Sequence, residues 1–256
     1  MQRVKDRFHK PDGTKHGSLQ SCIRTNDIEL VGDGSHLTYF EMIGNFSFGG
    51  GDYESSVEMW HLILSDLDVD VTNIHVHPSR DDHRRMWEKR KYEVVNDESC
   101  VWSDGQIGGE CCEVFCGDLE IGNLVNPMGI STDVGFGWER LHQVVERKDR
   151  VDQTSLFGKY HPIVSDHSRT LEVMRENGIK PGGKGRGYIC KRLVRRMLPY
   201  LTDEKFIFDD WIDGERKLQR NKLKECRRLW RRHSDKSPEW WWETHGLFPE
   251  ELPLIK

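Results

Sequence analysis

The sequence has no long hydrophobic run, and no stretch approaches the about 18 consecutive apolar residues that a membrane-spanning helix needs. Its first residues, MQRVKDRFHKPDG, lack the apolar middle of a secretory signal, so we expect a cytoplasmic protein with no membrane partner. It also lacks the paired cysteine spacing of small disulfide-rich domains. Its 7 cysteines are an odd number spread over 256 residues, and this pattern predicts free thiols in a reducing compartment.

Internal repeats and the common nucleotide and metal motifs are absent as well. The glycine-rich segment GGKGRG (182–187) lacks the final Lys-Ser/Thr of a P-loop, and it follows a predicted helix where a P-loop follows a strand. A basic turn is therefore favoured over a nucleotide-binding loop. Cys100, Cys111, Cys112 and Cys116 are close in sequence but form no Cys-x-x-Cys pair. Their spacing favours free thiols over a structural zinc site.

The composition is that of a folded protein, with 36% hydrophobic and 10% aromatic residues. The charges nearly balance, with 38 Lys and Arg against 43 Asp and Glu. However, residues 184–232 contain 16 basic and 7 acidic side chains, so the rest of the chain carries the negative excess. This asymmetry indicates a phosphate-rich partner, or alternatively the solvated faces of long helices, and composition leaves both open.

The order of the predicted elements indicates the fold class. Short β-type runs fill residues 20–120, and helical spacing dominates after Asp133. We expect strands at 37–44, 73–78, 111–117 and 119–125, and helices at 54–67, 81–91, 138–148, 165–177, 188–201 and 213–232. Strands followed by helices predict an α+β fold, in which an antiparallel sheet with flanking helices precedes a helical domain. We divide the chain into a core of residues 1–150 and a helical domain of residues 151–256.

Several segments together resemble one family. QSCIRTNDIELVGDGSHLTYFEMIGNFSFGG (20–50) is similar to motif 2 of alanyl-tRNA synthetases, which are class II aminoacyl-tRNA synthetases. Further blocks match in order along the chain: 81–89, 101–115, 119–125, 131–141, 165–198 and 240–252. The resemblance implies a class II synthetase-like core followed by a shortened tRNA-recognition region. It does not extend to the family's editing and C-terminal domains, so it implies a minimal form.

The resemblance implies that the protein activates an amino acid with ATP and Mg²⁺, forming an aminoacyl-adenylate. Arg24 matches the motif 2 arginine, whose planar fork suits a carboxylate and the α-phosphate together. Phe40 and Arg140, the last residue of GFGWER (135–140), match the two sides of the adenine site, and Arg24 and Arg140 are the predicted catalytic residues. His36 and Met42 complete the predicted ATP site, although the motif 2 loop around His36 is shortened.

The other predicted ligands of the core come from the same resemblance. Glu120, and less directly Glu139, match metal-binding carboxylates, although each is alternatively a surface carboxylate. In the amino-acid site, Asp133 matches the carboxylate that holds the substrate ammonium, and Asn123 matches an amide near the substrate carboxylate. Trp102 matches a wall of the pocket, and Gly135 matches a glycine that allows close approach of the substrate.

Two departures from the family concern the amino-acid pocket. Gly122 stands where the family has a tryptophan before the Asn, and this predicts a larger pocket and puts alanine specificity in doubt. Glu110 replaces a family proline, so an extra carboxylate faces either the pocket or solvent. If Glu110 faces the pocket, a cationic or polar substrate becomes conceivable.

The helical region predicts contact with RNA. A basic stripe suited to phosphates is formed by Lys184, Arg186, Lys191, Arg192, Arg195 and Arg196. The family's Asn before Arg-Gly-Tyr, which helps to read the acceptor stem, is missing from GGKGRGY (182–188), so selective reading of the usual tRNA is less secure. MQRVKDRF (1–8) aligns after most of the family's motif 1, so a homodimer or a partner chain could supply the missing part.

Three functions are therefore compared. The first is activation of alanine or a related small amino acid and its transfer to a tRNA 3′ end. The second keeps the adenylation but passes the aminoacyl group to a non-tRNA acceptor. The third is a non-catalytic paralogue that binds RNA or a nucleotide, and retention of Arg24, Glu120, Asp133 and Arg140 argues against it.

Overall fold

The computed structural model describes residues 5–26, 28–50 and 53–256, and the chain divides into two compact units. The first unit consists of Met1–Cys22 and Phe40–Leu156, and the second of Ile23–Tyr39 and Phe157–Lys256. The observed boundary thus follows residue 156 rather than residue 150, and the segment 23–39 belongs with the helices. Buried hydrogen bonds explain this, because the backbone N–H of Thr38 donates to Asp166 at 2.9 Å and the Thr38 hydroxyl lies 2.8 Å from that of Thr170.

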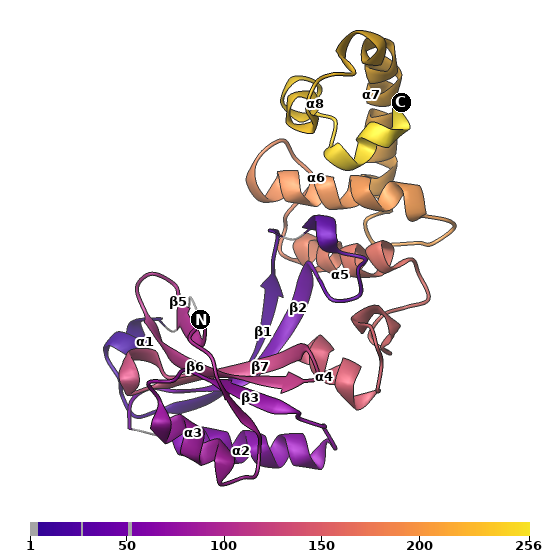
Figure 1. The fold of residues 1–256 in the computed structure, drawn as a ribbon. Helices are drawn as coiled ribbons and strands as arrows, with labels where there is room; N and C mark the ends of the chain where they lie inside the picture. Colours follow the sequence, from indigo (N-terminus) through magenta and orange to yellow (C-terminus); the bar gives the residue numbers. More distant parts are fainter. Residues whose placement is uncertain (1–4, 27, 51–52) are drawn as a thin grey trace. The chain divides into compact units, whose positions relative to one another are not determined.

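A mostly antiparallel sheet forms the first unit, in the order β1-β2-β8-β7-β6-β3-β4 with β5 added on β6 (Figure 1). Its strands are β1 Lys15–Ile23, β2 Tyr39–Ser47, β3 Asn73–Val76, β4 Val94–Asn96, β5 Val101–Ser103, β6 Gly108–Cys116, β7 Leu119–Val125 and β8 Thr132–Gly137. The pairs β2–β8, β8–β7, β7–β6, β6–β3 and β5–β6 are antiparallel, and β3–β4 is parallel. The fold class expected from the sequence is confirmed.

Helices α2 Tyr53–Asp66 and α3 Asp81–Glu88 cover one face of this sheet. Strand side chains that alternate toward this face form the main core with Val57, Trp60 and Trp87. Trp60 stacks on Phe136 with ring centroids 4.1 Å apart. The remaining helices of this unit are α1 Lys5–His9 and α4 Trp138–Val145, with 3-10 turns at Pro127–Gly129 and Val151–Gln153.

The opposite face of the sheet carries polar residues from neighbouring strands, and we call it the open face. Glu113, Asn123, Gly135 and Gly44 lie directly beside one another across β6, β7, β8 and β2. One position away along each strand, side chains such as Cys112 and Leu124 point into the core. The open face is therefore available for a ligand, whereas α2 and α3 cover the other face.

The second unit is helical. It contains α5 Pro162–Glu176, α6 Gly185–Met197, α7 Asp209–His233 and α8 Pro238–His245, with 3-10 turns at Ile28–Leu30, Leu198–Tyr200 and Pro249–Leu254. Apolar residues of α5, α6 and α7 pack around Phe208 in one core. Trp241 of α8 lies in a second core with Cys226 of α7. In the part of the chain that the structure describes, no helix is long and apolar enough to cross a membrane.

Candidate active site

Antiparallel register brings several predicted ligands onto the open face of the first unit. Asn123 is paired with Glu113 on one side and with Gly135 on the other. Asp133 lies two residues before Gly135, beside Val125. Side chains two residues apart on a strand share a face, so Asp133, Asn123 and Gly135 lie on the same face of the sheet.

A bulge in β7 brings Glu120 onto the same face. Glu120 and Asn123 are three residues apart, a spacing that points side chains to opposite faces of a regular strand. The register shifts here, because Val114 is opposite Gly122 whereas Phe115 is opposite Glu120. Ile121 is the extra residue and is buried in the core. The bulge thus re-aims Glu120 toward the open face.

Glu120 is engaged with Arg140 from the first turn of α4. Their charged groups are 3.3 Å apart, and Arg140 also donates to the Glu120 backbone carbonyl at 2.5 Å. The side chains of Arg140 and Glu120 are 39% and 35% exposed. Exposed ion pairs contribute at most about 1 kcal/mol, so a nucleotide phosphate or a cation can displace this one at little cost.

Glu139 is in a different environment from Glu120. Its side chain is buried and accepts a hydrogen bond from the Glu41 backbone N–H at 3.0 Å. The contact ties α4 to β2. Of the two predicted metal ligands, Glu120 is the one whose carboxylate lies on the accessible face.

Asp133 is 9% exposed, and burial raises its pKa to about 7. A buried carboxylate gains most when a cation approaches, because the cation compensates the lost hydration of the charged form. This environment suits recognition of an ammonium group.

Glu113 is an open-face carboxylate that sequence reasoning missed. Burial raises its pKa, and the nearby carboxylates of Glu120 and Asp97 raise it further. Only the register with Asn123 identifies its position, and sequence analysis had no means of assigning that register.

The walls of the predicted pocket come from β2 and β5. Phe40 and Met42 alternate along β2 toward the open face, and Met42 is paired with Gly137. A Cβ at Gly135 would lie 2.6 Å from the Met42 Cε, so the Met42 side chain lies directly over Gly135 of β8. Trp102 packs against the cluster of Cys100, Cys111 and Val125 at one end of the same face.

Arg24 and His36 lie in the second unit, so their predicted roles beside the first unit's residues stay predictions. The Arg24 side chain is exposed, and its backbone N–H donates to the Thr38 carbonyl at 2.9 Å. His36 Nδ1 lies 2.6 Å from the Asp33 carboxylate.

The prediction that Gly122 enlarges the amino-acid pocket is wrong. Gly122 is paired with Val114 and Phe136 and faces the core, opposite to Asn123. A Cβ there would lie 2.4 Å from the Phe136 ring. The space is occupied by the Phe136–Trp60 stack, so Gly122 bears on core packing rather than on substrate size.

The structure also resolves the alternative left open for Glu110. Its carboxylate lies 3.5 Å from Arg80, which precedes α3, and its side chain is 40% exposed. Glu110 is an odd number of residues from Cys111 and Glu113 within β6, so it points away from the open face. Glu110 therefore adds no carboxylate to the amino-acid pocket.

The cations predicted to bind RNA are in unequal environments. Arg195 is buried, donating to Glu215 at 2.8 Å and lying 3.6 Å from Glu251. Arg192 is paired with Glu29, and Arg196 donates to the carbonyls of Glu29 and Val31. Lys191 lies 3.7 Å from Glu215. Lys184 and Arg186 are exposed.

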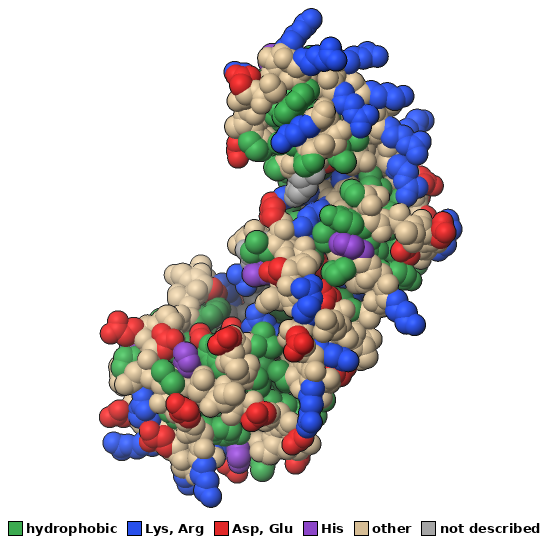
Figure 2. All heavy atoms as spheres, turned by 45° about the vertical axis from the view of Figure 1, so that its right-hand side comes forward, with side chains coloured by type: hydrophobic (Ala, Val, Ile, Leu, Met, Phe, Trp, Pro, Cys, Tyr) green, Lys and Arg blue, Asp and Glu red, His purple; other side chains and the backbone are tan. Residues whose placement is uncertain are grey.

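Helix α7 carries a larger exposed basic surface, which we call the α7 face. Its members recur at helical spacing: Lys217, Arg220, Lys224, Arg227, Arg228, Arg231 and Arg232, all exposed. Figure 2 shows Lys and Arg side chains gathered over the helical unit. Sequence analysis counted these charges but did not single them out, because charge alone does not distinguish buried from exposed cations.

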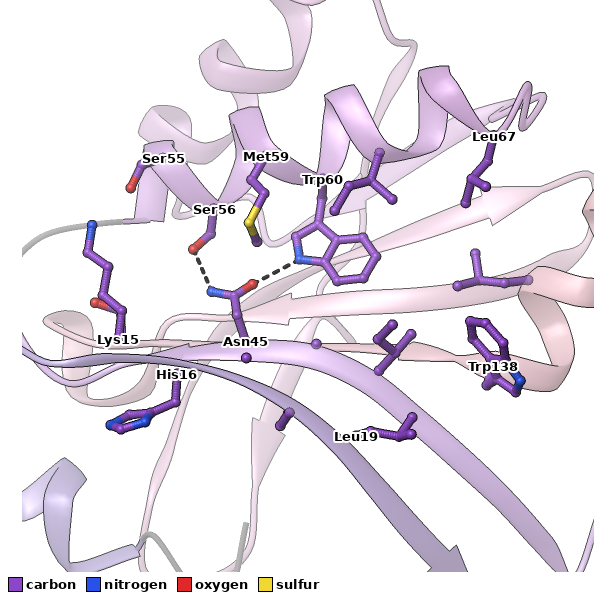
Figure 3. A pocket seen from close by; sticks show the side chains of 17 residues that line it. Lys15, His16, Leu19, Asn45, Ser55, Ser56, Met59, Trp60, Leu67 and Trp138 are labelled. Atoms are coloured by element: carbon purple, nitrogen blue, oxygen red, sulfur yellow. Dashed lines mark hydrogen bonds between the residues drawn. The ribbon is translucent and has the colours of Figure 1, made fainter.

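A hollow of about 690 Å³ lies elsewhere in the first unit, between α2 and strands β1 and β2 (Figure 3). Its lining includes Met59, Trp60, Leu67 and Trp138, and Asn45 bonds to Ser56 and Trp60 within it. It contains none of the predicted site residues. Nucleotide chemistry needs cations and carboxylates, so the open face is a better candidate than this hollow.

Comparisons with known proteins identify the family to which the chain is related. The family described as tRNA synthetases class II (A) matches residues 3–128. An alanine–tRNA ligase of Desulfitobacterium hafniense is 31% identical over 261 aligned positions, which cover 75% of this chain and 29% of that protein. The corresponding ligase of Endomicrobium trichonymphae is 29% identical, covering 74% and 29%. Among solved structures, a pyrrolysyl-tRNA synthetase from Desulfitobacterium hafniense matches with a TM-score of 0.35 and 15% identity, covering 62% of this chain and 52% of that one.

The chain therefore contains a class II aminoacyl-tRNA synthetase catalytic domain. Within that class it is homologous to alanyl-tRNA synthetases over 75% of its length, and it spans 29% of the length of the first relatives it matches.

Proposed function

We propose that this protein activates alanine or a related small amino acid with ATP and transfers it to a tRNA 3′ end. The observation that carries the proposal is the convergence of Asp133, Asn123, Glu120 and Arg140 on one accessible face. The family relationship supports the same chemistry. Gly122 and Glu110, the two departures that questioned a small substrate, both point away from this face.

Each residue has a distinct role in the proposed reaction. The substrate carboxylate attacks the α-phosphate of ATP, the bond to pyrophosphate breaks, and an aminoacyl-adenylate forms. Asp133 holds the substrate ammonium and Asn123 orients the carboxylate. Arg24 and Arg140 supply fixed positive charge, Arg24 at the α-phosphate and Arg140 against the adenine opposite Phe40. Such reactions depend on positioning and charge stabilisation more than on proton transfer.

The residues on the open face also fit a magnesium ion. Glu120 offers a half-exposed carboxylate next to Glu113, and Mg²⁺ binds carboxylates together with nucleotide phosphates. When bound, the ion would neutralise charge on the outer phosphates. Glu120 would hold the magnesium ion once its ion pair with Arg140 is broken and Arg140 contacts the nucleotide.

The direct test is amino-acid-dependent exchange between ATP and pyrophosphate, measured on the purified chain with each proteinogenic amino acid. Exchange with alanine or one related small amino acid is expected. Charging is then measured with total tRNA and with periodate-oxidised tRNA, whose 3′ end cannot accept. Exchange without charging would favour the non-tRNA acceptor, and no exchange with any amino acid would contradict the proposed reaction.

We expect the α7 face to bind RNA phosphates, because its cations are exposed whereas Arg195 is buried. The double variant Arg220→Glu, Lys224→Glu reverses two charges one turn apart. It should weaken tRNA binding at least about tenfold at low salt. The slope of the logarithm of the binding constant against the logarithm of the salt concentration should decrease in magnitude by about 1 for each phosphate that the variant no longer neutralises.

Filter binding or fluorescence anisotropy across a salt series measures both quantities. The matched control is Lys89→Glu, Lys148→Glu, which makes the same charge change at exposed positions of the first unit. Equally weakened binding in both variants would show a net-charge effect and not a docking surface.

Asp133 should make amino-acid binding depend on pH. The substrate ammonium binds the ionised carboxylate, and the Asp133 pKa is raised to about 7 by burial. Affinity should therefore fall by about tenfold for each pH unit below 7 and be level above it. The KM for the amino acid in the exchange reaction, measured between about pH 5.5 and 8, checks this prediction. Asp133→Asn should bind more weakly with no such dependence, and a level profile in the unmodified protein would contradict the role.

A further inference from the structure

Two cysteines and a glutamate meet at one end of the open face. Cys111 and Glu113 are two residues apart on β6 and so share a face, and Cys100 directly precedes β5. The Cys111 backbone N–H donates to the Cys100 carbonyl at 2.9 Å, so the two cysteines lie side by side. The Sγ atoms of Cys100 and Cys111 and a carboxylate oxygen of Glu113 all lie within 4.8 Å of one another.

The neighbouring cysteine takes no part in this group. Cys112 faces the core, where its sulfur lies 3.2 Å from the Tyr53 hydroxyl and 3.2 Å from the Trp87 ring nitrogen. Cys116 packs against the same core. Strand alternation therefore selects Cys111 from an adjacent pair, and a spacing search for Cys-x-x-Cys cannot find the group.

The surroundings suit a bound cation. Cys100 and Cys111 are 0% and 2% exposed and pack against Val125 and Trp102. Glu113 is half-buried beside them. Two thiols and one carboxyl group, all of which ionise to anions, therefore lie close together where little water reaches them. A divalent ion compensates such crowding, because it satisfies all three once the thiols lose their protons.

We propose that Cys100, Cys111 and Glu113 bind a zinc ion. Soft thiolate ligands select Zn²⁺ over Mg²⁺. Tetrahedral zinc has Zn–S bonds of about 2.3 Å and Zn–O bonds of about 2.0–2.2 Å, so its ligand atoms are about 3.5–4 Å apart. The sulfur and oxygen atoms lie within 4.8 Å of one another, which is close to these separations. On binding, two Zn–S bonds and one Zn–O bond form, and the two thiol protons pass to solvent.

The zinc site is of the open type. Within the described residues the group has three members and no fourth Cys, His, Asp or Glu. Zinc sites with three protein ligands keep the fourth position for water or a substrate group. Since Glu113 is paired with Asn123, the proposed zinc site would share the open face with the proposed amino-acid site. The metal site itself does not depend on the adenylation reaction.

Metal binding is tested on the full chain without ATP or amino acid. After reduction, removal of metal by a chelator and dialysis against zinc, one Zn²⁺ per chain is expected by mass spectrometry of the metal. With Co²⁺ instead, the spectrum should show thiolate-to-cobalt charge transfer and the visible bands of a tetrahedral ion. Cys100→Ser and Cys111→Ser should each lower zinc affinity by at least about 100-fold and weaken the charge-transfer band.

Cys116→Ser is the matched control, since it removes a thiol from the same strand but outside the group. It should keep the stoichiometry and the cobalt spectrum. The proposal is overturned if the reduced protein binds no zinc, or if the Cys100 and Cys111 variants keep the cobalt spectrum. It is also overturned if the two cysteines form a disulfide that persists under the reducing conditions used. Failure of the exchange assay with intact zinc binding would reject the proposed reaction alone.

Discussion

Replacing Arg24 with alanine should reduce ATP–pyrophosphate exchange by at least about 100-fold while leaving both units folded. Removing one fixed donor from a site of developing negative charge typically has an effect of this size. Arg24 is exposed and is positioned through its backbone bond to Thr38, so truncating the side chain leaves that bond intact. The initial rate of amino-acid-dependent exchange at saturating ATP measures the effect.

Arg147→Ala is a suitable control, because that side chain is 81% exposed and is paired with Asp68 at the surface. Its exchange rate should equal that of the unmodified protein. A thermal melt of Arg24→Ala should also match. An Arg24→Ala exchange rate within threefold of the control would remove Arg24 from the α-phosphate and leave Arg140 as the principal cation of the site.

The local elements of the fold could be predicted from the sequence, because their signals are local. Helical spacing placed α2, α5 and α7 within a few residues of their observed ends, and β7 was predicted at residues 119–125 as observed. Strand β8 was missed. It is a short central strand, Thr132–Gly137, that runs directly into α4, and its two glycines weaken the β pattern.

The side-chain directions could not be predicted. Asn123 and Gly122 are neighbours in sequence, yet Asn123 lies on the open face and Gly122 faces the core. Glu120 joins the open face only because the β7 bulge changes the alternation. A family resemblance aligns such residues but does not show which of their side chains line the pocket. The expectation of a larger pocket at Gly122 arose from this gap, because only the register shows that Gly122 faces the core.

The basic region shows the same limit for charge. Sequence analysis grouped six cations of residues 184–196 as one surface, although they project from different sides of α6. The structure shows four of them, Lys191, Arg192, Arg195 and Arg196, in interactions within the helical unit, whereas the cations of the α7 face are exposed. Burial, and not the number of charges, decides which cations can meet a phosphate.

Arg195→Ala should therefore act on stability, lowering the unfolding free energy of the helical unit by about 3–5 kcal/mol. The guanidinium donates to Glu215 of α7 and to the Gly246 carbonyl after α8, and it lies 5.4 Å from the Phe248 ring centroid. Its removal leaves buried carboxylates uncompensated. Lys191, 3.7 Å from Glu215, compensates part of that charge, which favours the lower end of the range.

Hydrogen exchange followed by mass spectrometry measures this effect, because peptides of α6, α7 and α8 are resolved from those of the sheet. Arg195→Ala should lose protection in the helices and keep it in β6 and β7. Arg228→Ala, an exposed cation of the α7 face, should change protection by less than about 0.5 kcal/mol. The double variant Arg195→Met, Glu215→Gln should recover part of the protection, since it removes the buried charge together with its partner. Unchanged helical protection in Arg195→Ala would show that the network does not stabilise the unit.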